Sequence, residues 1–114
     1  MKIVLFLVSA ILLFSVRPFA EPKNYGHGSE TCGSYVSVRE RARSGDRASR
    51  IEELAYLSWF KGFSTKFSLD FQSDILKNKD DAALALWLEN YCRGNPLKPF
   101  FSASVALIAS ISKE

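Results

Sequence analysis

Residues 80–96 read DDAALALWLENYCRGNP, and this stretch decides the fold. Asp80 and Asp81 stand where negative charge favours the start of a helix. No Gly or Pro interrupts residues 82–93, whereas Gly94 and Pro96 end the helical pattern. One face of the helix carries the apolar side chains, which are Leu84, Trp87, Leu88, Tyr91 and Cys92. The stretch therefore predicts an amphipathic helix over residues 82–93.

Three further helices are predicted on either side of this one. The first runs from Thr31 to Ser44, followed by Gly45 as a helix stop and Asp46 as a cap for the next helix. The second covers residues 48–66, and the fourth covers residues 98–112. The second helix is expected to present one stripe, formed by Ile51, Leu54, Ala55, Ser58 and Gly62. The sequence thus predicts an all-α fold, a small compact bundle of about four helices.

Residues 64–79 show no pattern that selects one type of structure. Phe67, Leu69 and Phe71 alternate with polar residues, which fits either a short strand or a loop anchored by aromatic side chains. A single helical turn is expected over residues 73–76, and a polar link follows it.

The N-terminal segment has the layout of a secretory signal peptide. Residues 3–16 are an apolar run of 14, preceded by Lys2 and followed by Arg17 and, at position 20, by Ala20. The run is shorter than the roughly 20 residues of a spanning helix, although an uncleaved anchor is the alternative. We expect a signal peptide over 1–20, a flexible arm over 21–30 and one helical domain over 31–114. The protein is expected to be periplasmic, with no membrane contact after cleavage.

Charge gives little support to a nucleic-acid partner. The chain has 15 Lys and Arg against 12 Asp and Glu, and loss of Lys2 and Arg17 with the signal peptide would leave 13 against 12. Five arginines fall within residues 39–50, but four acidic residues of the 40–53 stretch interleave with them. A solvated helix surface with ion pairs is the favoured interpretation, and a role of these arginines in an interface is the other.

Cys32 and Cys92 are the only cysteines. An even number of cysteines in a small exported domain favours a disulfide, and two cysteines allow one intramolecular pairing. Metal ligation and a reactive thiol are the competing interpretations. The single histidine, His27, lies in the predicted arm, far in sequence from either cysteine.

No set of residues with the pattern of a catalytic site is evident. The adjacent acids of residues 52–53 and 80–81 would point in different directions on a helix, and no Gly-rich phosphate loop is present. The length fits one domain. We therefore expect a protein that is not an enzyme and that uses no cofactor and no metal.

Three stretches resemble a known family. They are residues 31–46 (TCGSYVSVRERARSGD), residues 56–63 (YLSWFKGF) and residues 86–97 (LWLENYCRGNPL). Over about residues 31–110, this arrangement resembles the Rap/Tai-type periplasmic immunity proteins of bacterial type VI secretion, whose general shape is like that of the HdeA-like acid-stress chaperones. The resemblance implies a helical domain with a Cys32–Cys92 disulfide. It also implies binding to a toxic peptidoglycan amidase and occlusion of its active site.

The loop 70–80 is the predicted partner-binding segment, because it mixes apolar and charged side chains as interfaces do. The predicted contact residues are Asp70, Phe71, Asp74, Lys77 and Lys79. The competing interpretation is that Phe71 and Ile75 fill the core. A periplasmic chaperone that loosens in acid is the alternative function, and a homodimer is left open.

Overall fold

The computed structural model describes residue 23 and residues 25–114. The predicted signal peptide lies outside the described residues. In chain order the elements are the 3-10 helix η1 (Gly26–Ser29) and the helices α2 (Cys32–Arg43), α3 (Arg47–Phe71), α4 (Asp81–Gly94) and α5 (Phe100–Ile111). None of these described helices is both long and apolar enough to cross a membrane.

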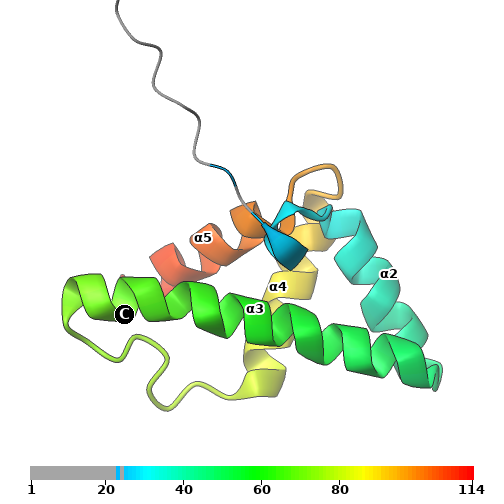
Figure 1. Ribbon diagram of the computed structural model, residues 1–114, viewed down its shortest axis with the longest axis horizontal. Helices are drawn as coiled ribbons and strands as arrows, with labels where there is room; N and C mark the ends of the chain where they lie inside the picture. The colour runs from blue at the N-terminus through cyan, green and yellow to red at the C-terminus, as the bar shows by residue number, and fades with distance from the viewer. Residues whose placement is uncertain (1–22, 24) are drawn as a thin grey trace, which may run out of the picture.

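Helix α3 runs the length of the domain (Figure 1). Helix α2 packs on α3 and α4, α5 packs on α4, and η1 packs where α3 and α5 meet. The all-α prediction is confirmed: the chain forms a compact four-helix domain with a Cys32–Cys92 disulfide.

Polar side chains start three of the helices. Thr31 Oγ1 accepts a hydrogen bond from the Ser34 amide, and Asp46 Oδ2 accepts one from the Ser49 amide, each at 3.1 Å. Asp80 Oδ2 caps α4 in the same way, at 3.1 Å from the Ala83 amide. Each carboxylate or hydroxyl satisfies an amide that has no partner within its helix.

Residues 67–71 are helical, so the prediction of a strand or an aromatic-anchored loop there is wrong. Helix α3 continues to Phe71 and ends at Gln72, which has the left-handed backbone conformation (φ 51°). In a helix, the aromatic residues at positions 63, 67 and 71 are four apart and lie in one row, which the alternation at 67, 69 and 71 concealed. In place of the helical turn expected over 73–76, two backbone turns follow, closed by Lys77 and Lys79 amides.

The face of α3 that enters the core also differs from the predicted stripe. Ile51 and Leu54 are 62% and 63% exposed, whereas Tyr56, Phe60 and Ser64 are buried. This row offers two large rings to the centre of the domain. There the Tyr56 ring packs within 5.0 Å of its neighbours, which are Tyr35 and Phe100.

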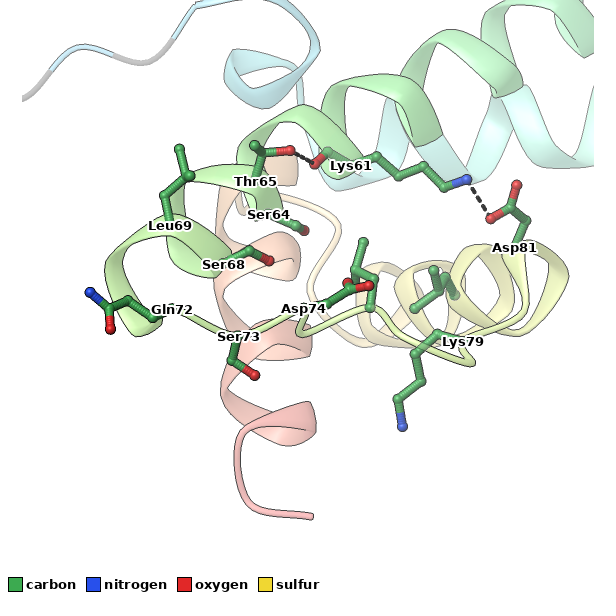
Figure 2. A pocket seen from close by; sticks show the side chains of 12 residues that line it. Lys61, Ser64, Thr65, Ser68, Leu69, Gln72, Ser73, Asp74, Lys79 and Asp81 are labelled. Carbon is green, nitrogen blue, oxygen red and sulfur yellow. Dashed lines mark hydrogen bonds and ion pairs between the residues drawn. The ribbon is translucent and has the colours of Figure 1, made fainter.

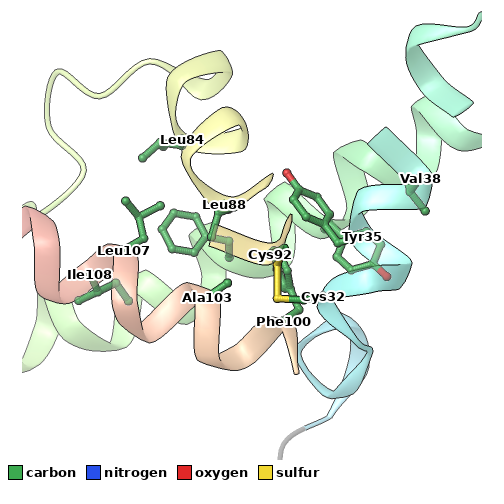
Figure 3. Packing of buried hydrophobic residues seen from close by; sticks show 12 residues of the cluster. Cys32, Tyr35, Val38, Leu84, Leu88, Cys92, Phe100, Ala103, Leu107 and Ile108 are labelled. Carbon is green, nitrogen blue, oxygen red and sulfur yellow. A yellow bond between two sulfur atoms is a disulfide. The ribbon is translucent and has the colours of Figure 1, made fainter. Parts of the chain in front are cut away.

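The disulfide lies in the core (Figure 3), where both sulfur-bearing residues are fully buried. Around it, the start of α2 is bonded to the segment between α4 and α5. The Cys32 amide donates to the Lys98 carbonyl at 2.7 Å, and the Gly33 amide donates to the Pro96 carbonyl at 2.9 Å. A Cβ on Gly33 would lie 3.3 Å from the Pro96 oxygen, so glycine permits this close approach. We call this set of contacts the disulfide junction.

Residues 26–29, which were predicted to belong to a flexible arm, form the 3-10 helix η1 instead. The His27 ring packs at 4.3 Å from the Tyr56 ring, and the Tyr56 hydroxyl donates to Glu30. Trp59 Nε1 donates to the Tyr25 carbonyl at 2.9 Å. These contacts fix η1 to α3. A carboxylate oxygen of Glu30 also lies 3.1 Å from His27 Nδ1.

Reduction of the disulfide is expected to destabilise the domain by about 4 kcal/mol, because the bridge closes a loop of 60 residues in the unfolded chain. Urea unfolding with and without dithiothreitol measures this difference. Mass spectrometry of the intact protein should show a gain of two hydrogen atoms on reduction. Two alkylatable thiols in the oxidised protein would contradict the bridge.

Candidate functional site

The five predicted contact residues lie at the C-terminal end of α3 and in the link that follows it, residues 72–80. Asp70 and Phe71 are the last two residues of α3, whereas Asp74, Lys77 and Lys79 belong to the link. The structure therefore places two of the five on a helix rather than in a loop.

A groove of about 630 Å³ lies between α3 and the link (Figure 2); we call it the link groove. Of the five predicted residues, Asp74 and Lys79 line it, and the other three do not. Lys61 Nζ and Asp81 Oδ1, 2.6 Å apart, form an ion pair at its margin. The remaining lining side chains are mostly hydroxyl and amide groups, namely Ser64, Thr65, Ser68, Gln72 and Ser73, with Leu69, Leu76 and Leu84.

The most exposed apolar residues of this region are Leu69 and Phe71, at 74% and 61%. Phe71 therefore does not fill the core. Ile75, the other residue considered for that role, is partly buried and packs against the core cluster. We call Leu69, Asp70, Phe71, Asp74 and Lys77 together the α3 tip.

Charged side chains surround the two apolar residues of the α3 tip. Asp70 pairs with Lys66 at 2.7 Å, one helical turn away. Lys79 pairs with Glu114, and Lys77 makes no ion pair with any described residue. Positions 69 and 71 are two apart on a helix, so the two apolar side chains point to different sides: Leu69 lines the link groove, and the Phe71 ring lies 6.2 Å from that of Phe67. The tip thus offers two separate apolar contacts with charged side chains next to them, a combination that protein interfaces use.

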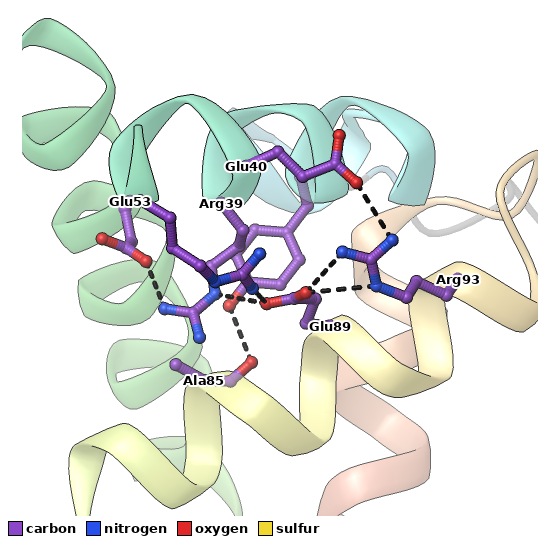
Figure 4. Close-up of polar contacts among 8 residues, drawn as sticks. Arg39, Glu40, Glu53, Ala85, Glu89 and Arg93 are labelled. Carbon is purple, nitrogen blue, oxygen red and sulfur yellow. Dashed lines mark hydrogen bonds and ion pairs between the residues drawn. The ribbon is translucent and has the colours of Figure 1, made fainter. Parts of the chain in front are cut away.

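A second polar cluster joins α2, α3 and α4 (Figure 4). Its centre is Glu89 on α4, which is 2% exposed. Arg39 Nε donates to Glu89 at 2.8 Å, Arg93 donates to it at 2.8 and 3.1 Å, and Arg43 donates to it as well. Arg39 also pairs with Glu53 on α3. Glu89 therefore joins α2 to α4, and the Arg39–Glu53 pair extends the cluster to α3.

These arginines keep Glu89 ionised. Burial alone would raise the pKa of Glu89, but hydrogen bonds from Arg93, Arg43 and Arg39 outweigh it and lower the pKa to about 2. Beside the cluster, burial raises the pKa of Tyr35, so its hydroxyl stays protonated and donates to the Ala85 carbonyl at 3.1 Å. The cluster therefore stabilises the domain by linking α2 to α4 and to α3.

The sequence predicted ion pairs between the arginines of residues 39–50 and acidic residues close to them in the chain. In the structure, Arg39 and Arg43 instead bond to Glu89, which is 50 and 46 positions away. Arg39 is largely buried, so a solvated surface does not describe it. Glu89 lies between Leu88 and the Tyr91–Cys92 pair on a helix with an apolar face, and Arg93 follows it at i+4. The place of Glu89 beside the apolar face and the spacing of Arg93 are the two features of the sequence that could have indicated a buried ion pair.

No family model, curated protein or solved structure matches the chain. Among the described residues, no group of three or more His, Cys, Asp or Glu side chains lies together in a way that would hold a metal ion.

The variant Glu89→Gln is expected to lower the free energy of unfolding by about 3 kcal/mol or more, since it leaves buried positive charge without its partner. The matched control is Glu40→Gln, which removes an exposed carboxylate 3.0 Å from Arg93 and should cost less than about 1 kcal/mol. Urea unfolding of both variants gives the comparison, and equal costs would remove the special role of Glu89.

The stability of the domain is expected to fall as the pH drops from about 4.5 to about 2. Glu89 has a lower pKa in the folded than in the unfolded chain, so its contribution is complete above the unfolded value and disappears near pH 2. At 1.36 kcal/mol for each pKa unit, the contribution is about 3 kcal/mol. Urea midpoints measured from pH 6 to pH 2 should decline less in Glu89→Gln than in the unaltered protein.

Proposed function

We propose that the protein is an exported binding protein of the immunity type, which inhibits a peptidoglycan-degrading amidase in the periplasm. The observation that carries the binding role is the α3 tip, where Leu69 and Phe71 are exposed on two sides of the helix end, next to charged side chains such as Asp70. The resemblance to the Rap/Tai-type immunity proteins supplies the amidase as the partner.

An inhibitor of this kind needs a rigid surface rather than reactive groups. Leu69 and Phe71 are held on a helix, and α3 is tied to the rest of the domain through the buried rings of Tyr56 and Phe60. A surface fixed before binding loses little conformational entropy in the complex, which favours tight association. The link groove beside the tip offers space for a partner's loop.

The compartment is part of the same proposal. The disulfide is consistent with an oxidising compartment, and the described residues contain no free cysteine. Export to the periplasm, which the N-terminal segment predicts, would bring the domain to the site where an amidase attacks the cell wall.

The variant Phe71→Ser should weaken binding to a purified peptidoglycan amidase by about 30-fold, as expected for an apolar residue at the centre of an interface. Isothermal titration calorimetry and a peptidoglycan hydrolysis assay measure affinity and inhibition. Replacing the rim charges together (Asp70→Asn, Asp74→Asn and Lys77→Gln) should chiefly slow association and reduce its dependence on salt.

The matched control is Leu54→Ser, at an equally exposed position nearer the other end of α3. It should leave affinity unchanged. Unaltered affinity in both Phe71→Ser and the rim variant would exclude the α3 tip. Absence of binding to every amidase in a panel would exclude this enzyme class as the partner.

The alternative function, a chaperone that loosens in acid, is tested by circular dichroism. The stabilisation from Glu89 is complete above about pH 4.5 and is lost progressively below it, so this site favours loosening only in stronger acid. Retained near-UV signal at pH 3 would argue against the chaperone, because a packed domain exposes no new apolar surface.

A further inference from the structure

A second groove, of about 800 Å³, lies where η1, α3 and the start of α5 meet (Figure 1). Six residues form most of its lining: Tyr25, Trp59, Gly62, Phe63, Pro99 and Phe101. We call it the aromatic groove. The Trp59–Tyr25 hydrogen bond, at 2.9 Å, fixes one side of it.

The aromatic groove is continuous with the α3 tip. The Phe63 ring contacts three neighbours, Trp59, Phe67 and Phe101, with ring centroids 5.2 Å apart in each case. The Phe67 ring in turn lies 6.2 Å from that of Phe71, the apolar residue of the tip. A row of rings therefore leads from the proposed contact surface into the groove.

Gly62 has no packing reason within its own domain. A Cβ at this position would meet nothing within 4 Å, although glycine inside a helix costs about 1 kcal/mol relative to alanine. Helix α5 has no charged side chain between Phe100 and Ile111, yet its Phe101 and Val105 are exposed. The folded domain thus has an apolar groove with empty space next to Gly62.

The charge of the groove selects the kind of occupant. Among the described residues that line the groove, Lys23 is the only charged one, and none carries a carboxylate. Lys23 makes no ion pair with any described residue. An apolar segment that carries an Asp or Glu beside its anchoring side chain would satisfy both the walls and the lysine.

We propose that the aromatic groove receives an apolar, acidic peptide segment of the same partner that contacts the α3 tip. The proposal rests on the binding function above. An anchoring side chain lies over Gly62 between the Trp59 and Phe101 rings, and a carboxylate next to it pairs with Lys23. Tyr25 and Trp59 supply the large, rigid contact area that binding anchors use.

The probe is a library of random 12-residue peptides displayed on phage, selected on the protein expressed from its full-length sequence under oxidising conditions. Enriched peptides should combine aromatic or aliphatic residues with Asp or Glu. Labelled copies are then titrated by fluorescence anisotropy. Replacing their acids by amides should weaken binding about tenfold to the unaltered protein but not to Lys23→Gln, since only the former offers the charge.

Gly62→Leu is the decisive variant, because a Cβ at this position meets nothing within 4 Å and the longer side chain extends into the groove. It should weaken peptide binding at least tenfold while its melting temperature stays equal or rises. Gly62→Ala, which adds one methyl group, should bind within about twofold of the unaltered protein. Gly94→Leu, at a second glycine with open space around it, is the matched control and should bind normally.

Unchanged peptide binding in Gly62→Leu overturns the proposal, as does enrichment of basic peptides. A concentration-dependent dimer that Gly62→Leu abolishes also overturns it, because the occupant is then a second copy. The two proposals fail separately. Amidase binding that Phe71→Ser weakens and Gly62→Leu leaves intact removes only the groove. Peptide binding lost in Gly62→Leu, without any amidase bound, removes only the amidase.

Discussion

The disulfide junction is the constraint on which the rest of the structure depends. It fixes the first turn of α2 against the last turn of α4, through the bridge and through the amides that donate to Pro96 and Lys98. The packing of α2 on α4 also brings Arg39 and Arg43 of α2 to Glu89 on α4. The disulfide and the buried charge cluster therefore join the same two helices at different points along them.

The helices that pack on α3 are much shorter than α3 and leave one end of it uncovered. At 1.5 Å per residue, its 25 residues extend for about 37 Å, whereas the 12 residues of α2 and of α5 each extend for about 18 Å. The excess leaves Leu69 and Phe71 uncovered at one end. The exposed Leu69 and Phe71 side chains add little to the core, and their contact with water is unfavourable. This exposure is the feature on which the proposed binding role rests.

Much of this fold was predictable from local signals. Helix α4 carries its own start and stop, with Asp80 as the cap and Gly94 at the end, and two cysteines leave one bridge. The continuation of α3 was not predictable, because alternating residues over a short stretch fit a strand as well as a helix. Nor was its buried face, since large rings occur on several sides of α3. Contact with Tyr35 and Phe100, which lie far away in the sequence, selects Tyr56 for the core.

Charge is the property whose meaning the structure changes most. The excess of basic residues in the sequence invites the idea of a negatively charged partner, yet Arg39, Arg43 and Arg93 are committed to Glu89. Charge spent on internal pairs gives no long-range attraction, because each pair is close to neutral at a distance. What the exterior of α3 offers instead is rings, an open glycine and a few single charges at their edges. If the proposed partner binds this surface, shape and apolar contact would supply most of the recognition, and a single charge such as that of Lys23 would set orientation.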